Sequence, residues 1–314
     1  MPLDPDSAAF VARLRELNLP RYETLTPYEA RAAMAVARKA AAVEPPTVRQ
    51  TWDFEIPVAG QAIAVRLYRP IEDEAVLPLL IFFHGGGWVL GDLESHDILC
   101  RRLSNAGRCA VLAVDYRLAP ENKFPVAVDD AIAVTRWAFA NAAKLDVDPL
   151  RVAIGRDSAG ANLAAVVTHV ARDAEELSFR LQLLIYPAVE LGFIHQSYEL
   201  NEEALPVLCE TMEWFREHYL AGLEQLDDWR ASPLRAPNFV GLPPAYVLTA
   251  GYDPLADEGR AYVEKLSGAG VSTHHRHYPG QFHGFLTMGV AFPTTQTALN
   301  EIGIALQEAL EKVG

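Results

Sequence analysis

Two short segments of uninterrupted apolar residues, 77–83 and 109–114, constrain the fold of this chain most strongly. A strand built only of apolar residues is typical of a parallel sheet that helices cover on both faces. Further strands are predicted at 151–154, 181–187, 245–249 and 273–278. Because predicted helices alternate with these strands, the sequence predicts an α/β fold with a mostly parallel central sheet built from right-handed crossovers.

The first part of the chain does not follow this alternation. Residues 7–17 and 27–42 carry apolar side chains at helical spacing, which predicts two amphipathic helices. The strands predicted at 48–56 and 62–68 alternate in polarity, as antiparallel strands at the edge of a sheet do. We interpret residues 1–46 as N-terminal cap helices.

A second interruption lies between residues 188 and 229. It contains an acidic stretch at 199–203 and a predicted helix at 206–220. Its length favours an insertion over the alternative, an ordinary crossover helix. We interpret 188–229 as a cap insertion. The main α/β domain is then expected to comprise 47–187 and 230–314.

Charge and composition exclude several classes of partner. The chain has 27 Lys and Arg against 41 Asp and Glu, a formal charge of −14 that repels nucleic acid and anionic membranes. No run of about 18 apolar residues predicts a membrane-spanning helix, and the acidic N-terminus lacks the regions of a signal peptide. The negative charge instead favours a small neutral or apolar partner. The three cysteines have no metal or disulfide spacing, which favours a reducing cytoplasm.

A serine stands where the strand at 151–154 turns into a predicted helix. Ser158 is followed by Ala159 and Gly160, and a serine on such a sharp turn resembles the nucleophile elbow of hydrolases. The alternative is an ordinary helix start capped by Asp157 or Ser158. Arg156 stands two residues before the serine, where the elbow signature has glycine, and its long side chain must leave or crowd the turn.

Two later residues complete a plausible catalytic set. Asp253 and His283 each come just after a predicted strand, and the order Ser158, Asp253, His283 is the order expected for a serine triad in an α/β-hydrolase. Catalytic groups collect beyond the carboxyl ends of parallel strands. The order and placement together therefore favour a triad over a helix cap and a loop histidine.

Glycines after the strand at 77–83 suggest the donors that such a triad needs. His84 is followed by Gly85, Gly86 and Gly87, and glycine lets backbone N–H groups face a cavity without a Cβ in the way. We expect Gly86 and Gly87, with Ala159 of the elbow helix, to bind a tetrahedral oxyanion.

These motifs together resemble the hormone-sensitive-lipase-like family of α/β-hydrolases, in its bacterial carboxylesterase branch. The matches run from about residue 47 to 290 and include 84–88, 115–121, 157–160 with 162–164, 186–187, 253–255 with 257–259, and 283–285. The resemblance implies an α/β-hydrolase fold with a helical cap and a cofactor-free serine carboxylesterase for short- to medium-chain acyl esters. It also implies Ser158, Asp253 and His283 as the triad, supported by His84, Gly85, Asp157 and Gly160. A homodimer through the strand at 273–278 is expected by analogy.

Arg156 leaves a second reading open. A catalytically weak or silent protein on the same scaffold would bind a small apolar acid or ester, and an amidase or long-chain lipase is a subordinate alternative. We expect activity to persist despite Arg156. His274, His275 and His277 fall on two faces of one strand, which favours a surface strand over a metal site, so no metal and no cofactor are expected. The physiological ester and the residues that shape the pocket are not encoded in any motif.

Overall fold

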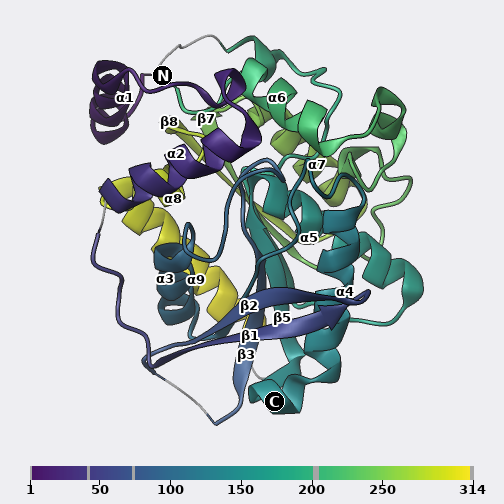
Figure 1. The fold of residues 1–314 in the computed structure, drawn as a ribbon. Helices are drawn as coiled ribbons and strands as arrows, with labels where there is room; N and C mark the ends of the chain where they lie inside the picture. The colour runs from purple at the N-terminus through teal and green to yellow at the C-terminus, as the bar shows by residue number, and fades with distance from the viewer. Residues whose placement is uncertain (1, 41–42, 73–74, 201–204, 312–314) are drawn as a thin grey trace.

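The eight-stranded sheet confirms the predicted α/β fold with a mostly parallel central sheet (Figure 1). The computed structural model describes residues 2–40, 43–72, 75–200 and 205–311. The strand order is β1-β2-β4-β3-β5-β6-β7-β8, with β1, β2 and β4 paired antiparallel and all other neighbours parallel. The strands are β1 (Gln50–Val58), β2 (Gln61–Arg69), β3 (Leu77–Phe83), β4 (Ala110–Val114), β5 (Val147–Asp157), β6 (Leu181–Ile185), β7 (Ala245–Tyr252) and β8 (Thr273–Phe282).

Helices cover both faces of this sheet, which explains why its central strands are continuously apolar. One face packs against α3 (Asp97–Gly107) and α9 (Pro293–Leu310), and the other against α4 (Val126–Ala140), α5 (Ser158–Ala174) and α7 (Ala256–Gly268). Every residue of β3 and β4 is buried. Figure 1 shows α3 and α9 on the opposite side of the strands from α4 and α5. None of the described helices has the length and apolar character that crossing a bilayer would need.

The main difference from the sequence-based expectation is α3, which we did not predict. Its buried residues Leu99, Cys100 and Leu103 have helical spacing, but Arg101 and Arg102 separate them, so the apolar signal is weak. The predicted elements are present with shifted ends: the predicted strand at 151–154 extends in both directions as β5, and the predicted helix at 126–143 ends at Ala140.

The N-terminal helices are attached to the sheet by specific contacts. Helix α1 (Pro5–Leu17) reaches the end of β8, where Ser7 Oγ donates to Gln281 Oε1 at 2.8 Å and the rings of Phe10 and Phe282 stack at 5.2 Å. Helix α2 (Pro27–Ala40) sends Arg31 to the carbonyl of Val89 at 2.9 Å. Residues 41–42 of the predicted second helix lie outside the described residues.

The segment 188–229 meets the same N-terminal region. Its helix α6 (Cys209–Tyr219) contacts the 3₁₀ turn η1 (Tyr22–Thr24), and Trp214 Nε1 donates to the carbonyl of Leu25 at 3.2 Å. The acidic stretch predicted at 199–203 lies mostly outside the described residues. In Figure 1, α2 and α6 lie together at one end of the sheet.

We expect one buried histidine to lower the stability of the native state as the pH falls from 7 to 5. Burial lowers the pKa of His169 to about 4 from an ordinary value of 6.5, so between these values the unfolded chain binds more protons than the native one. The stabilising contribution of neutral His169 is complete above pH 6.5 and is lost as the pH falls toward 4, with about 2 kcal/mol lost by pH 5.

Urea unfolding of the parent and of His169→Gln at pH 7 and pH 5 measures this contribution. The glutamine variant keeps a polar group opposite the hydroxyl of Tyr262, which lies 3.2 Å from His169 Nε2, and cannot titrate. The parent should lose about 2 kcal/mol more than the variant over that interval. Equal losses of unfolding free energy in both proteins would contradict the assignment of this pH dependence to His169.

Candidate active site

Three polar side chains form one hydrogen-bonded chain beyond the carboxyl ends of β5, β7 and β8. Ser158 begins α5 directly after β5, Asp253 follows β7, and His283 follows β8. His283 Nδ1 lies 2.9 Å from Asp253 Oδ2, and His283 Nε2 lies 3.0 Å from Ser158 Oγ. Because a carboxylate only accepts hydrogen bonds, Nδ1 donates to Asp253 and Nε2 is left to accept from the serine hydroxyl. This arrangement can activate a serine as a nucleophile.

The turn between β5 and α5 has the strained backbone of an elbow. Ser158 has φ of +55°, in the left-handed region that side chains other than glycine seldom adopt. Close packing at this turn is provided by Gly160, because a Cβ there would fall against the carbonyl oxygen of Phe83. Gly155 has the same function on the other side, where a Cβ would strike the backbone of Leu183.

Arg156 does not crowd the elbow as its position in the sequence suggests. Its guanidinium lies over the ring of Phe82 at 4.0 Å from the centroid and pairs with the carboxylate of Asp157. The arginine is 1% exposed. The fold therefore buries this residue within the domain.

The glycine loop after β3 has a left-handed backbone at two of its residues. Gly86 has φ of +118° and Gly87 has φ of +60°. Among the residues that the structure describes, no hydrogen-bond acceptor is found for the N–H of either glycine. Ala159 lies in the first turn of α5, where N–H groups have no acceptor within the helix. Among the described residues, the N–H groups of Gly86, Gly87 and Ala159 therefore donate no hydrogen bond to a backbone acceptor.

The residues predicted to support these motifs lie around the start of the loop. Gly85 N donates to Asp157 Oδ1 at 3.0 Å. His84 Nδ1 lies 2.9 Å from the carbonyl of Gly85, and the ring of Tyr116 stacks on that of His84 at 4.3 Å. The hydroxyl of Tyr116 donates to the carbonyl of His84 at 2.8 Å. Contacts from Asp157 and from Tyr116 therefore hold the start of the glycine loop in place.

A buried carboxyl group organises the loop beside Asp253. Glu258 Oε1 accepts from the N–H of Val189 at 2.6 Å and of Glu190 at 3.1 Å, and its Oε2 accepts from Tyr198 at 2.7 Å. Burial raises the pKa of Glu258 well above its ordinary value. The start of the segment 188–229 is thereby attached to α7, close to Asp253.

Two aromatic residues of α6 were not singled out by sequence reasoning. A Cβ added to Gly87 would fall inside the ring of Phe215, so that ring packs directly on the glycine loop. Tyr219, one helical turn later, stacks on Trp88 at 4.3 Å. Their spacing of four residues on a predicted helix marks one face, but nothing local indicates which loop that face covers.

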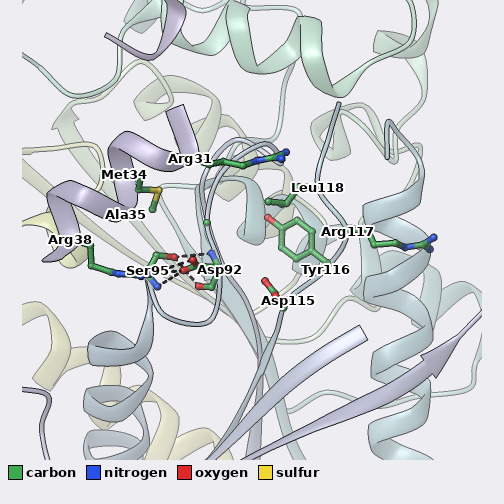
Figure 2. A pocket seen from close by; sticks show the side chains of 11 residues that line it. Arg31, Met34, Ala35, Arg38, Asp92, Ser95, Asp115, Tyr116, Arg117 and Leu118 are labelled. Atoms are coloured by element: carbon green, nitrogen blue, oxygen red, sulfur yellow. Dashed lines mark hydrogen bonds and ion pairs between the residues drawn. The ribbon is translucent and has the colours of Figure 1, made fainter. Parts of the chain in front are cut away.

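A cavity of about 360 Å³ opens between α2 and the loops that follow β3 and β4 (Figure 2). Arg31 and Arg38 of α2 line it, and they form ion pairs with Glu121 and Asp92 at 2.8 and 3.0 Å. Tyr116 also lines it, but none of Ser158, Asp253 and His283 does. The cavity therefore lies beside Tyr116 and is not lined by the three residues of the predicted triad.

The histidines of β8 do not form a metal site by geometry. His275 Nε2 and His277 Nδ1 both lie 2.9 Å from Thr249 Oγ1, which places them on one face, as alternation predicts. Within residues 2–40, 43–72, 75–200 and 205–311, no group of three or more His, Cys, Asp or Glu could hold a metal ion.

Comparison with known proteins shows that the chain matches one family model and is similar to several ester hydrolases. Residues 80–287 match a family model described as the alpha/beta hydrolase fold. A carboxylic ester hydrolase of Mycobacterium tuberculosis, LipN, is 40% identical over 267 residues, which cover 83% of this chain and 71% of that protein. An ethyl acetate hydrolase of Pseudomonas putida is 37% identical over 254 residues, 80% of each chain.

Solved structures of similar proteins cover nearly the whole chain. A mutant of LAE6, an alpha/beta hydrolase enzyme from the metagenome of Lake Arreo in Spain, superposes with a TM-score of 0.93 at 40% identity over 98% of both chains. A thermostable esterase from Pseudomonas putida superposes with a TM-score of 0.95 at 33% identity, over 99% of this chain and 98% of that one.

Proposed function

The chain belongs to the alpha/beta-hydrolase family and is a carboxylic ester hydrolase, and from this premise we propose that Ser158, His283 and Asp253 are its catalytic residues. The observation that carries the proposal is the unbroken chain of hydrogen bonds, 2.9 Å from Asp253 to His283 and 3.0 Å from His283 to Ser158. A nucleophile, a base and a group that orients the base are the parts that acyl transfer needs.

The reaction proceeds through an acyl-enzyme intermediate. Ser158 Oγ attacks the ester carbonyl carbon and gives its proton to His283 Nε2, while Asp253 stabilises the imidazolium. The N–H groups of Gly86, Gly87 and Ala159 bind the oxyanion of the tetrahedral intermediate. The intermediate then collapses, and the alcohol leaves with the proton from Nε2. Water activated by the same nitrogen hydrolyses the acyl-enzyme, and no cofactor takes part.

The substrates that we propose are short- to medium-chain acyl esters. The space above the glycine loop is limited by Phe215, which packs on Gly87, and one relative is an ethyl acetate hydrolase. We also propose that residues 1–46 and 188–229 form a cap over 47–187 and 230–314, since α2 and α6 both contact the loops beside the site.

Turnover of p-nitrophenyl esters by the purified protein tests this function. We expect high kcat/KM for the acetate, butyrate and octanoate esters and a marked fall for the palmitate ester, because we propose that the Phe215 ring packed on Gly87 limits the length of the acyl chain. Preference for palmitate would indicate a lipase, and hydrolysis of p-nitroanilides at comparable rates would indicate an amidase.

A silent ligand-binding protein is not favoured as an alternative. That reading depended on Arg156 damaging the elbow. The guanidinium lies on Phe82 and against Asp157, and His283 Nε2 is within hydrogen-bond distance of Ser158 Oγ.

We further propose a cytoplasmic protein that forms homodimers. Its cysteines, Cys100, Cys109 and Cys209, are all free thiols, which suits a reducing compartment. Strand β8 is at the edge of the sheet and pairs with β7 on one side, so its other side can pair with a second copy. A monomer at high concentration in size-exclusion chromatography with light scattering would contradict the dimer.

A further inference from the structure

Arg156 is a buried cation at the end of β5, two residues before Ser158. Its side chain is 0% exposed, against 5% for that of Asp157, its ion-pair partner. Among the residues that the structure describes, none of the three guanidinium nitrogens finds a hydrogen-bond partner. The charge is compensated instead by the carboxylate of Asp157 and by the ring of Phe82, 4.0 Å away. A charge held this far from water requires such compensation.

The surrounding residues are adapted to this side chain. A Cβ at Gly160 would lie 2.6 Å from Arg156 Cγ, so the absence of a side chain at the start of α5 makes room for the arginine. Burial lowers the pKa of His96 well below its ordinary value, and the positive charge of Arg156 lowers it further. His96 therefore remains neutral and adds no second positive charge.

Asp157 connects this cation to the glycine loop. Its Oδ1 accepts from the N–H of Gly85 at 3.0 Å, and a Cβ at Gly85 would lie 2.8 Å from the same oxygen. The backbone at Gly85 thus rests directly on the carboxylate. Gly85 precedes Gly86 and Gly87, so the Asp157 carboxylate holds the chain at the start of the segment that carries the next two N–H groups.

We propose that Arg156 is a positioning residue for the oxyanion donors. Its guanidinium keeps the Asp157 carboxylate turned toward the N–H of Gly85, and this contact holds the N–H groups of Gly86 and Gly87 in the geometry that binds a tetrahedral oxyanion. The inference rests on the proposed function of the site. Because the bound ester has no oxyanion and the charge develops only on the way to the tetrahedral intermediate, loss of the positioning lowers kcat and leaves KM nearly unchanged.

Two variants separate the charge of Arg156 from its volume. Arg156→Met can lie over Phe82 and fills similar space without a charge, whereas Arg156→Lys keeps a cation near Asp157. With p-nitrophenyl butyrate we expect the kcat of the methionine variant to fall about 10–100-fold, which is less than or near the effect of losing one oxyanion donor. The kcat of the lysine variant should stay within about 5-fold of the parent. Rates are counted per active site titrated with a phosphonate ester, so unfolded protein does not imitate a loss of kcat.

The affinity of a tetrahedral inhibitor distinguishes positioning of the oxyanion donors from a purely structural role of Arg156, because a purely structural role would leave that affinity unchanged. A phenylboronic acid forms a tetrahedral anionic adduct on the serine, so its affinity should fall by the same factor as kcat in the methionine variant. In the background Asp157→Asn, the change Arg156→Met should have little further effect on kcat, because both changes break the same connection.

The outcomes distinguish this inference from the proposed function. Unchanged kcat and boronic acid affinity in Arg156→Met, with turnover that depends on Ser158, would overturn the role of Arg156 and leave the esterase intact. Absence of Ser158-dependent turnover in the parent would overturn the function itself. If the methionine variant does not fold, Arg156→Gly replaces it: the same loss of kcat is expected, and a gain in kcat would overturn the inference.

Discussion

Replacing Ser158 with alanine is expected to lower turnover of p-nitrophenyl butyrate by about 10⁴–10⁶-fold. The substitution removes the oxygen that lies 3.0 Å from His283 Nε2, and no acyl-enzyme can form without it. Residual hydrolysis would come from the oxyanion donors and from binding alone. The fold should survive, because the change deletes one hydroxyl group and leaves the left-handed backbone at this residue occupied by a side chain of similar size.

The assay compares kcat/KM of the parent, of Ser158→Ala and of Ser267→Ala, all purified in the same way. Ser267 is exposed on α7, so its variant controls for the handling of a serine-to-alanine protein and should match the parent. Mass spectrometry after treatment with a phosphonate ester should show one adduct, at Ser158, in the parent and in the control. Turnover by Ser158→Ala at the rate of the parent would contradict the assignment of the nucleophile.

Replacing Gly86 with alanine is expected to lower kcat by at least about 10²–10³-fold, as the loss of an oxyanion donor does. Gly86 has φ of +118°, where any side chain is strained. A Cβ there would also fall against the carbonyl oxygen of Leu90, whose N–H donates to the carbonyl of Gly86 at 2.8 Å. The turn must therefore open, and the N–H groups of Gly86 and Gly87 move away from the oxyanion.

Gly60→Ala is the matched control for backbone strain. Gly60 has φ of +81°, and no atom lies within 4 Å of the position of an added Cβ. It lies in the turn between β1 and β2, so its variant should lose about 1 kcal/mol of stability and keep the kcat of the parent. Equal kcat in the two variants would show that Gly86 has no part in catalysis.

Local patterns were sufficient to predict most of the fold. The apolar segments at 77–83 and 109–114 correspond to β3 and β4, and the strands that alternate in polarity are the antiparallel edge pair β1 and β2. These elements can be predicted because burial on one or both faces leaves a period in the sequence itself. Helix α3 was missed because Arg101 and Arg102 interrupt its apolar pattern. Its packing on α9, where a Cβ at Gly303 would lie 2.8 Å from Ala106, is visible only in the structure.

Part of the candidate site could also be predicted from the sequence. The order of Ser158, Asp253 and His283, each just after a predicted strand, indicated where a triad would form, because parallel strands end at one edge of a sheet. Their roles stay a prediction until the variants are measured. The glycines after β3 were found for a similar reason, since a run of three marks exposed backbone.

The sequence by itself determined the class of fold, the order of its strands along the chain and the residue types at the site, because each depends on neighbours a few positions away. Only the tertiary structure decided how Arg156 is accommodated, what Asp157 holds and which loop Phe215 covers. Gly85 and Asp157 are 72 residues apart, and Arg21 and Thr211, which join the N-terminal region to α6, are 190 apart. Contacts over such separations arise from the packing of whole elements, and no local period in the sequence encodes them.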